Sequence, residues 1–250
     1  MIKRRRRPLR TRDRAALEVW QRGLNEVPPY DKRIGDAWNA FTVGKGKPLR
    51  QRINRALQYQ CVSRCVYCER SEFETIDHYR PKQQFPATAF AWPNFNGACW
   101  TCNRDKSQPL LFHHDRPMII NPMDEDPAAF FYIDPKNGFM AAALHLAEGT
   151  DDYIRADYTI SKLKLNERGL PKERRLAADN LRQALKFYEL TRGHRKAEEA
   201  LLVACRERNA LRAIVRQVMT NPDPQDKPLV DYCLQHSHRV KTFLQAIQWL

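Results

Sequence analysis

The sequence predicts an α+β protein in which a small core of short strands and loops lies between helical additions at the amino-terminal and carboxy-terminal ends. Apolar residues recur at three-residue and four-residue intervals before residue 61 and after residue 176, as they do in amphipathic helices. Between Cys61 and Ser107 the apolar stretches are short and are interrupted by Gly, Pro and Asn. Two Cys-x-x-Cys pairs fall inside this interrupted segment. We therefore expect the functional residues to lie there.

Two helices are expected before this core. Apolar residues in the segment 15–24 follow helical spacing, and Pro28 and Pro29 would end that helix. A second helix is expected over residues 49–60. Because the chain starts with a run of Arg and Lys, we describe residues 1–60 as a basic arm followed by a helical segment.

Residues 122–250 are expected to begin with extended segments and to continue as a helical cap or partner-binding region. Asn137-Gly138 is a typical hairpin turn. Helical spacing then predicts helices over residues 177–188, 197–218 and 229–250. Apolar residues near the end of the chain would form either a partner-binding surface or, as helical spacing favours, the core of the cap: Phe243, Leu244, Ile247, Trp249 and Leu250.

The charge of the chain favours polyanionic partners. It has 43 Lys and Arg against 29 Asp and Glu, a formal net charge of +14, which suits nucleic acid, ribosomes or anionic membrane surfaces without choosing among them. The basic start of the chain has no apolar stretch behind it, so it resembles neither a secretory signal nor a membrane span. We expect a soluble, cytoplasmic protein with no membrane partner.

The two Cys-x-x-Cys pairs predict a structural zinc site. Cys65 and Cys68 form one pair, and Cys99 and Cys102 form the other. Each pair can occupy two corners of a tetrahedron, and four thiolates close the coordination sphere of Zn²⁺, leaving no position for a catalytic water. In a reducing compartment such pairs indicate metal binding rather than disulfides.

Two alternatives remain for these cysteines. Cys61 also precedes Cys68 closely and would replace Cys65 in the set, or the thiols would be unrelated buried groups. Cys205 and Cys233 lie in apolar helical surroundings and are expected to be core residues.

The segment between the pairs contains TIDHYRPK at residues 75–82 and WPNF at residues 92–95, and the second pair continues into CNRDK, which ends at Lys106. This order resembles the HNH, or His-Me finger, nucleases, in which two strands and a helix hold one divalent cation. The resemblance implies a zinc-stapled ββα-metal (HNH) core over residues 61–121 and the hydrolysis of phosphodiester bonds.

The chemistry of that reaction explains the residue types. Neutral imidazole is a suitable base near pH 7, so His78 is the candidate for deprotonating the attacking water. Asp77 and Asn103 offer the hard oxygen ligands that Mg²⁺ or Mn²⁺ prefers, and they are the candidate ligands of the catalytic cation. By the resemblance, Asn94 is the central Asn, which would hold the catalytic loop and orient the imidazole. The candidate phosphate-binding residues are Arg80, Lys82 and Lys106.

Each of these residues has a less specific interpretation. An Asp-His pair on its own is more often a surface hydrogen bond or a helix cap, Asn94 would cap a following helix, and Asn103 and Lys106 would be ordinary polar residues of a helix. Two further groups are expected to lie at the surface. His113 and His114 should point in different directions from an extended chain, and the acidic run 124–126 should be a solvated loop or a further metal contact.

A narrower resemblance extends over residues 61–175. The phrases CVYCER, IDHYRPK, INPMDEDP and LKLNERGLPKERR together are similar to the PtuB type of HNH protein, found in Septu and retron-associated antiphage systems. That family implies an ATPase partner of the ABC or SMC-like type, PtuA, and a role in phage defence.

Three functions are therefore compared below. The first is an endonuclease acting on DNA or RNA. The second is a non-catalytic module in which the zinc knuckle and the basic arm bind nucleic acid, and the third is a structural subunit of an ATPase complex. No base-reading motif stands out, so we predict weak sequence specificity.

Overall fold

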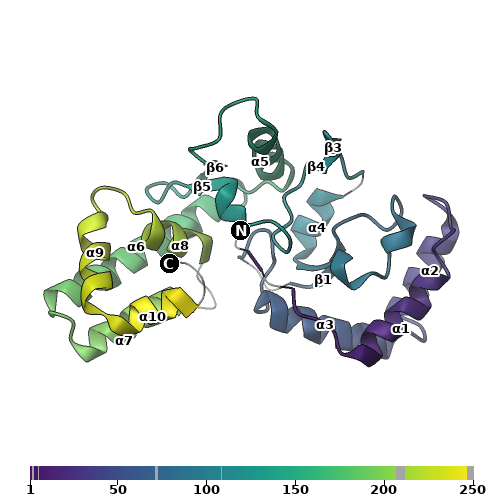
Figure 1. Cartoon of the computed structure of the whole chain (residues 1–250), viewed down its shortest axis with the longest axis horizontal. Coiled ribbons are helices and arrows are strands. Elements are labelled where there is room, and N and C mark those ends of the chain that lie inside the picture. Colours follow the sequence, from purple (N-terminus) through teal and green to yellow (C-terminus); the bar gives the residue numbers. More distant parts are fainter. Residues whose placement is uncertain (2, 5, 71–72, 108, 207–211, 247–250) are drawn as a thin grey trace.

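The computed structural model describes all residues except 2, 5, 71–72, 108, 207–211 and 247–250. Figure 1 shows one group of helices on each side of the small sheets, with the amino-terminal helices on one side and α6 to α10 on the other. Short strands and helices together confirm the predicted α+β class. Within the described residues, no helix combines the length and the apolar character that crossing a bilayer requires.

Three helices precede the core: α1 (Thr11–Arg22), α2 (Lys32–Thr42) and α3 (Lys47–Cys61). The first and third confirm the two predicted helices. The second lies in a segment for which no helix was expected. It begins after Asp31, whose carboxylate accepts a hydrogen bond from the Arg33 amide, and its Trp38 and Phe41 rings pack 5.2 Å apart.

Two strands and a short helix form the centre of the molecule. Strand β1 (Thr75–His78) pairs antiparallel with β2 (Phe95–Ala98), and α4 (Trp100–Lys106) follows at once. The short helices η1 (Pro86–Thr88) and η2 (Trp92–Asn94) lie in the connection between the strands. Every residue of β2 is buried, and a Cβ atom at Gly97 would lie 2.9 Å from the Phe73 ring, which explains the glycine.

The middle of the chain contains short hairpins and one helix. The elements are β3 (Phe112–His113), β4 (Arg116–Pro117), η3 (Pro127–Ala129), β5 (Phe131–Ile133), β6 (Met140–Ala142) and α5 (Asp151–Lys162). The predicted hairpin is confirmed: Asn137-Gly138 lies between β5 and β6, and Gly138 has φ +78°. Helix α5 was not predicted.

The carboxy-terminal part of the chain is helical, as expected. Its helices are α6 (Leu170–Leu190), α7 (Arg195–Arg206), α8 (Arg212–Thr220), α9 (Lys227–His236) and α10 (His238–Ala246). The single helix predicted over 229–250 is wrong, because the described part of this segment contains two helices. Residues 207–211, which lie between α7 and α8 in the segment predicted over 197–218, are outside the described residues. Ser237 separates the last two, and its hydroxyl accepts a hydrogen bond from the Val240 amide at the start of α10.

Of the apolar residues predicted at the end of the chain, Leu244 is buried and Phe243 is partly buried against the core. Leu244, Cys205 and Cys233 are at most 1% exposed, which confirms the core interpretation for these residues. Ile247, Trp249 and Leu250 lie outside the described residues.

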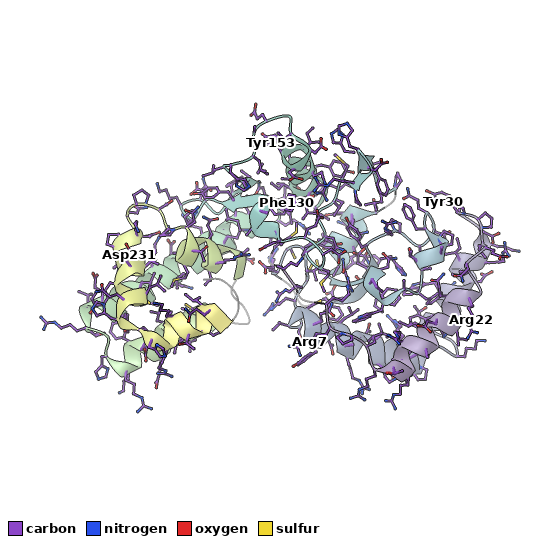
Figure 2. All side chains as sticks on the ribbon, in the orientation of Figure 1. Arg7, Arg22, Tyr30, Phe130, Tyr153 and Asp231 are labelled. Atoms are coloured by element: carbon purple, nitrogen blue, oxygen red, sulfur yellow. The ribbon has the colours of Figure 1, made fainter. Side chains whose placement is uncertain are left out.

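The basic start of the chain crosses the core instead of extending into solvent. Arg4 is only 5% exposed, and its amide donates to the Pro122 carbonyl. Arg6 donates to the carbonyls of Trp92 and Phe95, at 3.0 and 2.9 Å. Arg7, labelled in Figure 2, stacks its guanidinium 4.6 Å above a tyrosine ring of α3. Arg4 and Arg6 therefore make their contacts within the protein, while Arg7 stays exposed.

Candidate functional site

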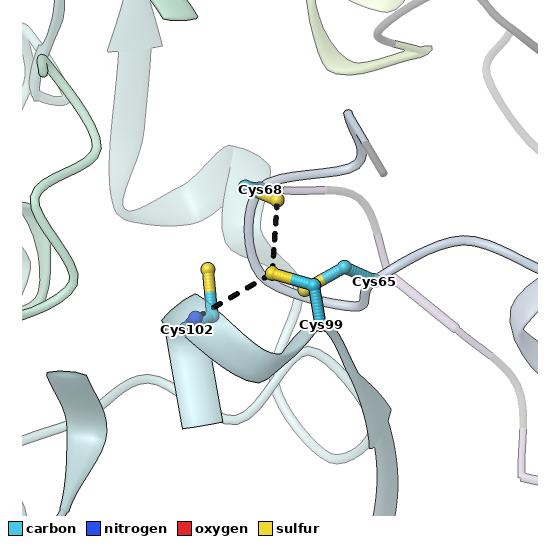
Figure 3. Close-up of side chains that lie close together, drawn as sticks. All are labelled: Cys65, Cys68, Cys99 and Cys102. Carbon is cyan, nitrogen blue, oxygen red and sulfur yellow. Dashed lines mark hydrogen bonds between the residues drawn. The ribbon is translucent and has the colours of Figure 1, made fainter. Parts of the chain in front are cut away.

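The four predicted zinc ligands converge at one point. Cys65 and Cys68 lie on the loop after α3, Cys99 immediately precedes α4, and Cys102 lies within it (Figure 3). The four sulfur atoms lie within 4.8 Å of one another, and all four residues are buried. Cys61 is outside this group, so both alternatives for the cysteines, replacement by Cys61 and unrelated thiols, are wrong.

The geometry of this cluster fits zinc. A tetrahedral Zn²⁺ with bonds of about 2.3 Å places its sulfur ligands about 3.8 Å apart, and the Cys68 and Cys99 sulfurs are separated by 3.8 Å. The Cys102 amide lies 3.4 Å from the Cys99 sulfur, and the Arg168 guanidinium lies 3.7 Å from the Cys102 sulfur. Hydrogen bonds from the other three thiols lower the pKa of Cys68, whereas burial raises the pKa of Cys65. Without a metal the cluster therefore does not favour four thiolates, and zinc binding would require the remaining thiols to release their protons.

A cavity of about 280 Å³ lies between α2, β1 and α4, and Trp100 and Asn103, which flank Cys102 in the sequence, line it. Five of the residues predicted for catalysis or phosphate binding line it: Asp77, His78, Lys82, Asn103 and Lys106. The structure therefore brings residues from within the 30-residue segment between the cysteine pairs together with residues that follow the second pair.

His78 is held in one tautomer by the backbone. Its Nε2 lies 2.9 Å from the carbonyl oxygen of Ala89. A carbonyl only accepts hydrogen bonds, so Nε2 carries the proton and Nδ1 keeps a free lone pair. Burial, and then the nearby Lys82 cation, lower the pKa of His78 to about 3. The imidazole is therefore neutral at physiological pH.

Asp77 is a buried carboxylate with one oxygen poorly satisfied. It is 1% exposed, and the Tyr67 hydroxyl donates to its Oδ2 at 2.7 Å. Its Oδ1 lies 3.1 Å from the Lys106 ammonium but receives no well-aligned hydrogen bond. The two charged groups are within ion-pair distance, but the ammonium is poorly aligned with Oδ1 for a hydrogen bond. This oxygen is therefore able to bind a further cation. A carboxylate oxygen of this kind is a hard ligand that suits Mg²⁺ or Mn²⁺.

Asn103 has its amide oriented by β1. Its Nδ2 donates to the Thr75 hydroxyl at 3.0 Å, and that hydroxyl in turn donates to the Ala98 carbonyl at 2.8 Å. Among the described residues, none donates a hydrogen bond to the Asn103 Oδ1. This oxygen is therefore left for a ligand on the cavity side.

Lys106 is more enclosed than a phosphate-binding residue needs to be. It is 4% exposed, and its ammonium donates to the carbonyls of His78 and Tyr79 at 2.7 and 3.2 Å. These contacts tie the end of β1 to α4. Phosphate binding by Lys106 stays a prediction.

Asn94 lies at the base of the loop that contains Ala89, whose carbonyl oxygen contacts His78. Its Oδ1 accepts from the Arg80 amide at 2.6 Å, and its Nδ2 donates to the carbonyls of Arg80 and Thr88 at 2.9 and 3.0 Å. Asn94 thus holds both ends of the connection, next to Ala89. The helix-cap alternative is wrong, because a strand follows Asn94 and its side chain bonds to this loop.

The remaining cations divide between two cavities. Lys82 lines the cavity that contains His78, and its burial there lowers the pKa of its ammonium group. Arg80 is exposed and lines a second cavity of about 350 Å³, together with Asn94. Two residues that the sequence did not indicate also line the first cavity. Arg50 of α3 has a buried Nε without a hydrogen-bond partner, and Trp100 is 61% exposed.

The acidic run is not a free solvated loop, which corrects the sequence interpretation. Glu125 forms two hydrogen bonds of 2.8 Å with the guanidinium of Arg155, a residue that is 1% exposed. The Asp124 carboxylate accepts a hydrogen bond from the side-chain Nδ2 of Asn121 at 2.6 Å, and the Asp126 carboxylate caps η3. Within the described part of the chain, these carboxylates belong to no group suited to a metal ion.

His113 and His114 differ from expectation as well. They lie near the surface as predicted, but they do not point apart: the two imidazole rings lie 4.2 Å from each other, and both contact Asp151.

Comparison with known proteins relates part of the chain to a Septu protein. No family model matches the sequence. Septu protein PtuB of Bacillus thuringiensis is 32% identical over 90 residues, which cover 33% of this chain and 32% of the relative. The chain thus matches about a third of the length of that protein.

Proposed function

We propose that this chain is an HNH-type endonuclease that hydrolyses phosphodiester bonds of DNA or RNA with a divalent cation. The observation that supports this best is that Asp77, His78 and Asn103 line one cavity, beside a cluster of four cysteines that could hold zinc. The succession of β1, β2 and α4 agrees with the strand, strand and helix of that family. The similarity to a Septu protein supports a role as the effector of an antiphage defence system, working with an ATPase partner of the PtuA type.

His78 would act as the general base. Its Nδ1 lone pair accepts a proton from the attacking water, while the Ala89 carbonyl retains the proton on Nε2. The rings of Trp38 and Phe95 lie 4.5 and 5.3 Å from the imidazole. They restrict its rotation, so Nδ1 keeps its direction during the reaction.

Asp77 and Asn103 would hold the catalytic Mg²⁺ or Mn²⁺ through their Oδ1 atoms, neither of which receives an aligned hydrogen bond from the described residues. When bound, the cation supplies Lewis-acid stabilisation of the charge that develops on the phosphate and the leaving oxygen. Tyr67 fixes the other oxygen of Asp77, so the carboxylate is oriented before any ion arrives.

Lys82 and Arg50 would bind the substrate phosphates, because both line the cavity and neither forms an ion pair with a described carboxylate. The exposed ring of Trp100 offers a surface on which a nucleotide base can stack. Arg80 faces the second cavity and would contact a phosphate farther along the strand.

Substitution of the base tests the proposal. His78→Ala should lower the rate of cleavage by about 10²-fold to 10⁴-fold, because the reaction loses its proton acceptor, while affinity for the nucleic acid is retained. Cleavage and binding are measured on the same labelled DNA and RNA, with His145→Ala, an exposed histidine outside the cavity, as the matched control. Unchanged cleavage by His78→Ala would overturn the enzymatic assignment.

The binding-module alternative loses part of its support, because Arg4 and Arg6 are engaged inside the protein. The role with an ATPase is tested separately. The chain is purified alone and with the ATPase encoded beside its gene, and both samples are assayed for cleavage with Mg²⁺ and for size by chromatography. If the ATPase changes neither the rate of cleavage nor the elution volume, the partner proposal is wrong and the nuclease proposal is unaffected.

A further inference from the structure

A second group of metal-binding side chains lies outside the proposed catalytic cavity. It consists of His113 and His114 at the tip of the β3–β4 hairpin and Asp151 in the first turn of α5. One nitrogen or oxygen atom of each residue lies within 4.8 Å of the other two. None of the three lines the cavity that contains His78.

The distances within this group suit a small divalent ion. His113 Nε2 lies 3.2 Å from Asp151 Oδ1, and His114 Nδ1 lies 3.1 Å from the same oxygen. Nitrogen and oxygen ligands bound to Zn²⁺ at about 2.0 to 2.1 Å in a tetrahedron lie about 3.3 Å apart. The three side chains therefore need to move little to bind an ion.

The backbone at the tip of the hairpin brings the two imidazoles together. His113 pairs with Arg116, and between them His114 and Asp115 have φ +44° and +62°. Two left-handed residues in a two-residue turn favour Asn-Gly, and a histidine adopts this conformation at a cost. In an extended chain the two side chains would point to opposite faces. The turn instead directs both rings to Asp151.

The local charge also favours a cation. In a chain of net charge +14, this tip and the start of α5 carry three carboxylates, Asp115, Asp151 and Asp152. Two guanidiniums, of Arg116 and Arg155, lie 2.7 and 3.6 Å from Asp152 and leave Asp151 to the imidazoles. The partners of the Asp151 carboxylate are the two imidazoles, which can give up their N–H protons to solvent when a metal binds.

We propose that His113, His114 and Asp151 bind a divalent transition metal such as Zn²⁺ and that this ion fastens the β3–β4 hairpin to the start of α5. Two imidazoles select Zn²⁺ over Mg²⁺, which prefers oxygen ligands. The His114 side chain is 73% exposed, so solvent completes the coordination sphere. The site is distinct from the cysteine cluster and from the oxygen ligands of the proposed catalytic ion.

Calorimetric titration of Zn²⁺ into the full chain, with its cysteine cluster already loaded, tests this site. The native chain should bind one further equivalent, and excess Mg²⁺ should not displace it. The double variant His113→Ala/His114→Ala should lose that equivalent, and Asp151→Asn should bind it at least about tenfold more weakly. His145→Ala, the control for an exposed histidine, should bind as the native chain does.

A second measurement separates a built site from surface binding. Zinc should slow amide hydrogen exchange of residues 112–117 in the native chain, because the ion joins the hairpin to α5, and should have no such effect in the double variant. The proposal is overturned if the native chain takes up no further zinc, or if the double variant binds it with unchanged affinity. Because these residues lie at the surface, circular dichroism should show the same fold in every variant.

Discussion

The protonation of His78 is determined by a main-chain atom. The Ala89 carbonyl fixes Nε2 as the donor, and Asn94 holds the loop on which that carbonyl lies. The tautomer of the proposed base is therefore determined by a backbone carbonyl. A side-chain substitution at residue 89 would leave this carbonyl in place. A neutral imidazole with a fixed tautomer is ready to accept a proton without prior rearrangement.

Lys106 is the residue at which the sequence and the structure suggest different roles. Lys106→Met would leave the buried Asp77 carboxylate without its ion-pair partner, so the free energy of unfolding should fall by about 3 to 5 kcal/mol, as measured by urea denaturation. Lys186→Met, at an exposed position of α6, is the control. If stability is unchanged while the salt dependence of nucleic-acid binding weakens, Lys106 binds phosphate and the structural role is wrong.

Arg50 is the residue that the structure adds to the proposed substrate site. Its Nε is buried at the cavity without a partner, so a phosphate would supply the missing hydrogen bond. Arg50→Ala should weaken binding of a short oligonucleotide by about 1 to 3 kcal/mol, measured by fluorescence anisotropy. Arg55→Ala, an exposed arginine on the same helix, should have little effect. Equal losses for the two variants would show that only overall charge matters.

Among single residues, the sequence could predict those that belong to a short motif. It could not predict the atoms and side chains that contact them in the folded protein. Asp77, His78 and Asn103 lie within or next to the cysteine segment, where a linear pattern reveals them. The Ala89 carbonyl is a backbone atom with no sequence signal. Arg50 comes from a helix that only the tertiary fold brings to the cavity.

The cysteine loop and α4 form the element on which the proposed active site depends. Removal of zinc with a chelator should unfold residues 61–106 and abolish cleavage even in excess Mg²⁺, because the four thiolates would join the loop after α3 to α4 and the free energy of metal binding would stabilise this fold. Metal content, circular dichroism and cleavage are measured together. Cys99→Ser should have the same effect, whereas Cys205→Ser, in the helical cap, should keep its cluster zinc. Full activity of a zinc-free chain would contradict a structural role.

The helices show which local signals a sequence provides. Helices α1 and α3 have regular apolar spacing and were predicted. Helix α2 carries the same signal, with Ile34, Trp38 and Phe41 at helical spacing, so its sequence was sufficient to predict it. The break before α10 depends on Ser237, which is fully buried and donates to Glu198 of α7 at 2.6 Å. Apolar spacing continues through such a break, so periodicity alone predicts one helix. The tertiary contact decides where it ends.

On the scale of the whole molecule, the loop that carries Cys65 and Cys68 also connects the two helical groups. Glu69, directly after Cys68, accepts a hydrogen bond from the Ala213 amide of α8 at 3.2 Å. Arg70 donates to the Arg168 carbonyl at 2.7 Å and lies 2.8 Å from Glu173 of α6. The residues that shape the cysteine cluster thus also position the helical cap.

A second connection of the cap, between Arg216 of α8 and Asp126, should depend on pH. Burial alone would raise the pKa of Asp126, but hydrogen bonds from Arg216 and the Ala128 amide outweigh burial, so the pKa is lowered. A lowered folded-state pKa means that the pair stabilises the fold above about pH 4 and that this contribution is lost as the pH falls through the folded-state pKa. Asp126 is partly exposed, so Arg216→Met should cost no more than about 1 kcal/mol at pH 7.

Denaturation at pH 7 and at progressively lower pH measures this dependence. The difference between the native chain and Arg216→Met should shrink towards zero in acid, and adding Asp126→Asn to the variant should change its stability little. A difference that grows in acid would contradict the sign of the effect.

The path of the amino-terminal arginines changes what the formal charge of this protein means. Arg4 lies 3.6 Å from Glu69, and Arg6 is bound to carbonyl oxygens of the core. These cations face the interior, so an approaching polymer would encounter a weaker electrostatic field than a count of basic residues suggests. On a cation-exchange column the folded protein should accordingly elute at lower salt than a denatured sample of the same chain.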